Sequence, residues 1–142
     1  MSKLRTVSWV LLAIAGVLAL LGALTSANLA YRGGFRIAGV PIAEVAAGRE
    51  AVVTGLRGAR GTAAAWAAGF ATLFLYVVLF PYRRGDVASW WAVLVATLVL
   101  LAVAGSRLLF TGSQAGMFEP MALAIVVLVA LLLDVRRLTA HP

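Results

Sequence analysis

The sequence predicts an all-α integral membrane protein, a four-helix bundle with a long loop or an interfacial amphipathic helix between its first two spans. Of the 142 residues, 63% are hydrophobic and only 12% are charged, and the mean hydropathy is +1.03. Soluble domains carry roughly 25% charged residues. A chain of ~150 residues buries only about 70% of its surface on folding, so this apolar excess requires lipid.

Four apolar runs organise the chain as a single membrane domain, residues 1–142. The predicted spans are residues 7–30, 62–82, 87–109 and 116–134. A bilayer core of ~30 Å needs about 20 helical residues, and the first three runs supply them. The fourth run is continuously apolar only over residues 120–133, so it crosses fully only if it starts before Glu119. Richness in alanine and leucine, without an alternation of period two, argues against a β-barrel.

The start of the first run has two interpretations. The stretch "MSKLR", followed by apolar residues and "TSA", also fits a signal peptide with a small-residue cleavage site. Its apolar core is longer than the ~7–15 residues typical of such peptides. We therefore expect an uncleaved transmembrane span.

Alanines recur every four residues along three of the spans. The positions expected to pack against other helices are Ala15, Ala19, Ala23, Ala64, Ala68, Ala92 and Ala96. Small residues let helices approach closely in lipid, where dispersion and backbone contact replace the hydrophobic effect. The alternative is a general excess of alanine without structural meaning. Close packing would make the bundle compact.

The basic residues suggest an orientation, although the two sides carry equal numbers of them. One group is concentrated beside the span ends and consists of Lys3, Arg5, Arg83, Arg84, Arg136 and Arg137. The other group is spread mainly through a long loop, residues 31–61. Basic residues close to span ends favour the cytoplasmic side. We expect a multi-pass protein of the plasma membrane, with both termini cytoplasmic and this loop outside.

The long loop contains its own helical pattern. Apolar residues from Ile42 to Leu56 recur at roughly helical spacing behind Pro41, a favourable first-turn residue. This pattern predicts an amphipathic helix in the membrane interface, broken or bent at Gly48. The segment is either a loop that covers the bundle, or a lid or docking surface for a partner or anionic lipid.

The connection "SRLLFTGSQAGMFEP" holds the candidate polar site. If Arg107 and Glu119 lie at membrane depth they must pair, because an unpaired charge there costs ~2.5–3.5 kcal/mol or more. Ser106 and Gln114 would then line a ligand-binding site around the pair. The alternative is that Glu119 stabilises the start of a helix led by Pro120, while Arg107 extends to the interface.

Several short motifs carry a family resemblance. "RG" enters the second span, "GSR" closes the third, a glycine-containing hairpin follows, and a glutamate begins the fourth. After residue 55 this pattern resembles the DoxX-like bacterial membrane proteins of unknown function. The resemblance implies a four-helix bundle, with Arg60, Arg107 and Glu119 as the matching polar positions.

The composition excludes several chemistries. The chain has no cysteine, and its single histidine is His141, so disulfides, thiolate metal sites and bis-histidine haem are excluded. We expect no metal, no cofactor and no catalytic constellation. Nucleic acid is not an expected partner, because the basic residues lie at the ends of apolar runs. Asp134 is expected to pair with Arg137 at a helix end.

Three classes of function remain. The first is a non-catalytic accessory or assembly subunit of a larger membrane complex, which implies a membrane-protein partner or a homo-oligomer within the bilayer. The second is a stand-alone binder or carrier of a lipid or other lipophilic molecule, held at Arg107 and Glu119. The third is an enzyme on a membrane-soluble substrate, with Glu119 as acid or base. We favour the first class over the second. The third has the least support, because one carboxylate with one arginine is thin evidence for catalysis.

Overall fold

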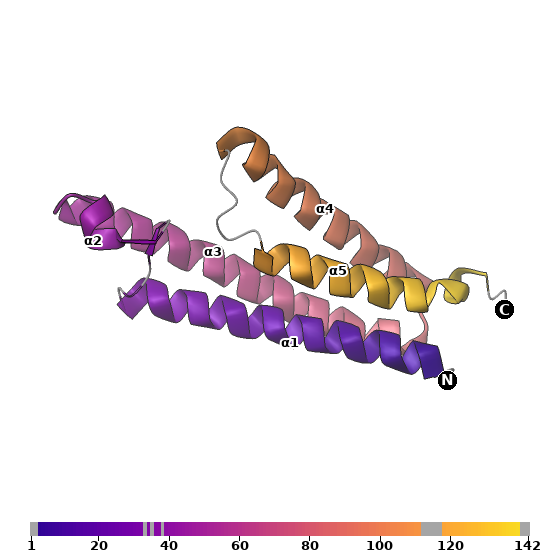
Figure 1. Cartoon of the computed structure of the whole chain (residues 1–142). Coiled ribbons are helices and arrows are strands. Elements are labelled where there is room, and N and C mark those ends of the chain that lie inside the picture. The colour runs from indigo at the N-terminus through magenta and orange to yellow at the C-terminus, as the bar shows by residue number, and fades with distance from the viewer. Residues whose placement is uncertain (1–2, 33, 35, 38, 112–117, 140–142) are drawn as a thin grey trace. The chain divides into compact units, whose positions relative to one another are not determined.

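The computed structural model describes residues 3–32, 34, 36–37, 39–111 and 118–139, and these are mostly helical (Figure 1). The elements in chain order are α1 (Lys3–Arg32), β1 (Arg36–Ile37), β2 (Val40–Pro41), α2 (Ile42–Val45), α3 (Glu50–Val77), the π-helix η1 (Val78–Tyr82), α4 (Val87–Thr111), α5 (Phe118–Leu133) and the 3₁₀-helix η2 (Val135–Leu138). The predicted helical class is confirmed.

Among the described residues, three helical segments are long and apolar enough to cross a membrane. They are Lys3–Arg32, Glu50–Tyr82 and Val87–Ser106. The fourth predicted span is shorter than expected, because α5 has 16 residues and starts at Phe118. At 1.5 Å per residue it is about 24 Å long, less than a bilayer core of ~30 Å. Residues 112–117, which would decide whether this span extends further, lie outside the described residues.

The region predicted as a loop over residues 31–61 is shorter than expected, because α3 begins at Glu50. Gly55 and Gly58 do not stop this helix. A helical glycine costs only about 1 kcal/mol relative to alanine, and the surrounding residues are mostly good helix formers. The predicted break at Gly48 is confirmed. Ala47 and Gly48 have φ of 47° and 74°, which ends the short α2 and separates it from α3.

The chain divides into two compact units. The terminal unit comprises Met1–Val17 and Leu73–Pro142, and the central unit comprises Leu18–Thr72.

In the central unit, β1 and β2 form a two-stranded antiparallel hairpin that contacts α2. Ile42 and Ala46 are buried there, and so is Ala30 near the end of α1. The phenol of Tyr31 covers Gly61, where an added Cβ would lie 2.8 Å from the Tyr31 hydroxyl oxygen. Gly61 therefore permits the close approach of Tyr31 to α3.

The terminal unit has the main apolar core, with α4 packed on α5. Its buried members are Leu12, Ala15, Val78, Tyr82, Trp90, Val93, Val127, Ala130 and Leu131. Gly16 brings α1 close to Leu75, whose side chain lies 2.6 Å from the position of an added Cβ. Pro81 lies within η1. Proline cannot donate the helical hydrogen bond, and the helix widens around it.

The predicted alanine positions differ in burial. Ala15, Ala23 and Ala64 are buried, and Ala19, Ala68 and Ala96 are half-buried. Ala92 is exposed, so its packing against another helix stays a prediction. The buried residues of α4 are Ser89, Trp90, Val93 and Thr97.

Candidate functional site

The predicted polar site at the connection between α4 and α5 is only partly described. Glu119 is exposed in the first turn of α5. The hydroxyl of Ser106 donates to the carbonyl oxygen of Val103 at 2.8 Å within α4. Gln114 and the side chain of Arg107 lie outside the described residues. Pairing of Arg107 with Glu119 therefore stays a prediction.

Arg60 belongs to the central unit, whereas Ser106, Arg107 and Glu119 belong to the terminal unit. Its Nε donates to the hydroxyl oxygen of Ser26 at 3.2 Å, which joins α3 to α1. This contact gives Arg60 a structural role within its own unit.

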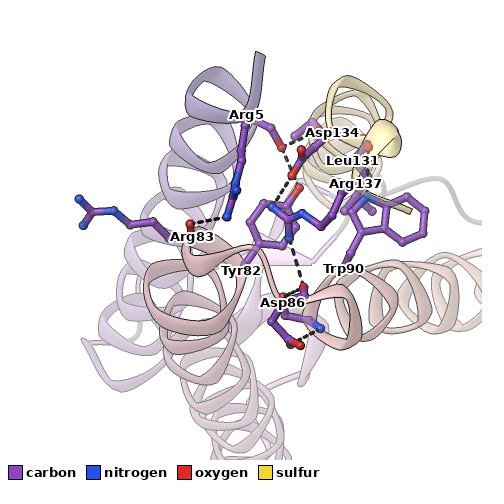
Figure 2. A network of polar contacts seen from close by, with 11 residues as sticks. Arg5, Tyr82, Arg83, Asp86, Trp90, Leu131, Asp134 and Arg137 are labelled. Carbon is purple, nitrogen blue, oxygen red and sulfur yellow. Dashed lines mark hydrogen bonds and ion pairs between the residues drawn. The ribbon is translucent and has the colours of Figure 1, made fainter. Parts of the chain in front are cut away.

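A different polar cluster lies in the terminal unit, where the start of α1, the turn between η1 and α4, and the end of α5 meet (Figures 1 and 2). We call it the polar clamp, and it consists of Arg5, Ser8, Tyr82, Asp86, Trp90, Asp134 and Arg137. Ser8 and Tyr82 are fully buried at its centre. The Ser8 hydroxyl donates to the Ala130 carbonyl oxygen at 2.7 Å, and its oxygen lies 2.8 Å from the Tyr82 hydroxyl. Because Ser8 has one proton, Tyr82 is the donor between the two hydroxyls.

The clamp satisfies carbonyl groups at the end of α5. The last four carbonyls of a helix have no partner within it, and an unsatisfied group costs several kcal/mol in lipid. Ser8 from α1 donates to one of these, that of Ala130. Trp90 from α4 donates from Nε1 to the carbonyl oxygen of Leu131 at 3.1 Å, and this oxygen also accepts the backbone N–H of Asp134 at 3.1 Å. The end of α5 is thus fastened to two helices that are distant in sequence.

Arg137 connects the same region to the turn before α4. It forms an ion pair with Asp134, as the sequence predicts, and both side chains are buried. Its Nη1 donates to the Asp86 carbonyl oxygen at 3.2 Å, and its guanidinium lies 4.1 Å from the centre of the Tyr82 ring (Figure 2). A cation over an aromatic face is attracted to it. Arg137 therefore draws together η2, η1 and the turn.

The turn itself is fixed by Asp86, Gly85 and Arg5. Asp86 is the N-cap of α4, and its Oδ2 accepts the backbone N–H of Ser89 at 2.8 Å. Gly85 has φ of 97° and lies against the guanidinium of Arg5. A side chain at this position would be strained and would displace Arg5. Arg5 in turn donates from Nη2 to the Arg83 carbonyl oxygen at 3.0 Å.

The clamp binds helices to one another, and each polar group described above contacts protein. No group of three or more histidine, cysteine, aspartate or glutamate residues is placed to hold a metal ion within the part of the chain that the structure describes. The sequence interpretation missed Ser8 and Tyr82, which lie in apolar runs. "DVAS" at residues 86–89 was the available signal for the helix cap, since it places a serine three residues after an aspartate.

Comparison with known proteins gives no relative, since no protein family, curated protein or solved structure matches the chain. The resemblance to DoxX-like proteins stays a prediction.

Proposed function

We propose that this protein is a non-catalytic subunit of a larger membrane complex, and that it docks on a transmembrane helix of its partner through one face of α3. The supporting observation is a difference among the glycines within its helices.

Contacts within the chain explain why two helical positions are occupied by glycine. Gly16 lies against Leu75, and Gly61 lies under Tyr31. In contrast, Gly55, Gly58 and Gly69 of α3, like Gly105 of α4, have no neighbouring atom within 4 Å of an added Cβ, and α3 carries three of them on one face. A glycine in a helix interior costs roughly 0.5–1 kcal/mol relative to alanine. An external helix that approaches closely would account for this cost, because small residues are what transmembrane helix contacts require.

These glycines share one face with other exposed residues of the central unit. We call it the outer face of α3, and it consists of Gly55, Gly58, Ala59, Thr62, Ala63, Trp66 and Gly69. The opposite face is covered within the unit, where Gly61, Ala64 and Ala71 are buried. Trp66 is 78% exposed at the middle of the outer face. An exposed tryptophan among small residues provides both a projecting anchor and room for a partner backbone.

The proposal includes the arrangement in the membrane. The three long apolar segments and the shorter α5 would form a four-helix bundle in the plasma membrane, with both termini in the cytoplasm. Basic residues are concentrated at the start of α1, in the turn before α4 and after the end of α5 (Figure 1). This concentration supports cytoplasmic termini.

The test compares two glycine-to-leucine variants in native membranes. Gly69→Leu places a large side chain on the outer face, and Gly105→Leu is the matched control, since an added Cβ at Gly105 of α4 also meets nothing within 4 Å. Each form is extracted in mild detergent, separated on a native gel and examined by mass spectrometry. We expect a stoichiometric partner with the wild type and with Gly105→Leu, and at least a tenfold loss with Gly69→Leu.

Two outcomes would contradict the proposal. Retention of the partner by Gly69→Leu would exclude the outer face as the docking surface. Migration of the wild type alone, or only with further copies of itself, would exclude an accessory subunit.

A further inference from the structure

We propose that the terminal unit binds the headgroup of an anionic phospholipid at its basic end. The basic end consists of Lys3, Arg5, Arg83, Arg84, Arg136 and Arg137, with Asp86 and Asp134 as the acidic residues among them. Three segments that are far apart in sequence meet there, namely the start of α1, the turn before α4 and the end of α5 (Figure 1).

Both acidic residues at this end are engaged by the protein. Asp134 is buried and paired with Arg137. The carboxylate of Asp86 accepts backbone N–H groups of Ser89 and Ala88, at 2.8 and 3.4 Å. Neither carboxylate reaches the exposed arginines, so the outward-facing charge of this end is basic.

The arginines divide into two groups. Arg5 and Arg137 donate to backbone carbonyls and hold the clamp together. Arg83 and Arg84 have exposed side chains, and Arg83 contributes only its carbonyl oxygen to the contact with Arg5. The side chains of Arg83 and Arg84 can therefore bind a ligand without loosening the fold.

Trp9 indicates the depth of this site. The Arg83 guanidinium lies 5.0 Å from the centre of the Trp9 ring. Tryptophan near a span end favours the level of the lipid headgroups. An exposed guanidinium beside it is at the height of the lipid phosphates, which it can bind with two parallel hydrogen bonds. Anionic lipids are preferred over zwitterionic ones, because the latter carry a cation that repels the other basic residues.

The test uses the full chain in detergent and native mass spectrometry, with phosphatidylglycerol as the anionic probe and phosphatidylcholine as the zwitterionic one. The variant is R83Q/R84Q. The matched control is R36Q/R49Q, which removes two exposed arginines from the central unit and changes the net charge equally. We expect the wild type and the control to retain phosphatidylglycerol, and R83Q/R84Q to bind it roughly tenfold to thirtyfold more weakly.

Three results would overturn the proposal. The first is equal retention of phosphatidylglycerol by R83Q/R84Q, and the second is an equal loss in the control, which would mean attraction by net charge alone. The third is full displacement of phosphatidylglycerol by inorganic phosphate, which would indicate a site for a free anion. R84Q alone is measured beside the double variant, because it leaves the contact between Arg83 and Trp9 in place. Circular dichroism verifies that both variants remain folded. Since partner docking is scored separately with Gly69→Leu, either proposal can fail alone.

Discussion

The two units of this protein hold their helices in different ways. In the terminal unit, polar side chains reach between segments separated by up to 122 residues and fasten the end of α5 to α1 and α4. In the central unit, small residues bring α1 and α3 together, with Tyr31 over Gly61 and Arg60 donating to Ser26. Polar fastening fixes one arrangement of helices, because each donor needs its particular acceptor. Small-residue contact is less specific, and the same kind of surface is presented outward on α3.

The largest loss of unfolding free energy is expected in the terminal unit, for Tyr82→Ala. The ring is fully buried in the core, its hydroxyl donates to Ser8 and its face carries Arg137. Removal of a buried aromatic side chain costs about 3–5 kcal/mol of unfolding free energy. Unfolding by a denaturing detergent measures the loss. Tyr76→Ala is the control, since Tyr76 is 60% exposed on the same helical segment. Equal losses in the two variants would refute a core role for the clamp.

An intermediate effect is expected in the central unit for Gly61→Leu. The new side chain would collide with Tyr31, and overpacking costs typically about 1–3 kcal/mol. Gly58→Leu, three residues away, meets no neighbouring atom and gains helix propensity of up to about 1 kcal/mol. Thermal unfolding in detergent should therefore shift in opposite directions. If Gly61→Leu and Gly58→Leu were both stabilised, the contact between Tyr31 and Gly61 would not be holding α3 against α1.

The smallest effect is expected for Asp86→Ala at the turn of the terminal unit. Loss of an N-cap costs about 1 kcal/mol, and Asp86→Asn should retain most of the stability because an amide oxygen still accepts the Ser89 N–H. Hydrogen exchange at the first turn of α4 reports this change directly. Similar protection in the alanine variant and the wild type would mean that the cap does not hold this turn.

The sequence interpretation succeeded where the physical cause is local. Hydropathy summed over a run of residues predicted the long apolar helices, and the spacing of Asp134 and Arg137 predicted their ion pair. It placed the start of the second span at residue 62, whereas α3 begins at Glu50. Gly55, Gly58 and Gly61 all lie within this helix, and Gly61 accommodates Tyr31, a residue 30 positions earlier.

The polar clamp shows more clearly that contacts between distant residues cannot be predicted from sequence patterns. Arg107 and Glu119 stand out in sequence because they are charges beside apolar runs. Ser8 and Tyr82 do not, since a serine and a tyrosine near span ends are ordinary. Their contact joins residues 74 positions apart. Such a contact depends on which helix faces meet, and no pattern within one helix contains that information.

The sequence by itself therefore determined a helical, membrane-type chain and where its long apolar segments lie, because transfer to lipid depends on composition over about 20 residues. Tertiary structure alone decided which polar groups would be buried together. The Ala130 and Leu131 carbonyls near the end of α5 each accept a side-chain hydrogen bond, and only the packing of α1 and α4 against that end brings Ser8 and Trp90 within reach of them.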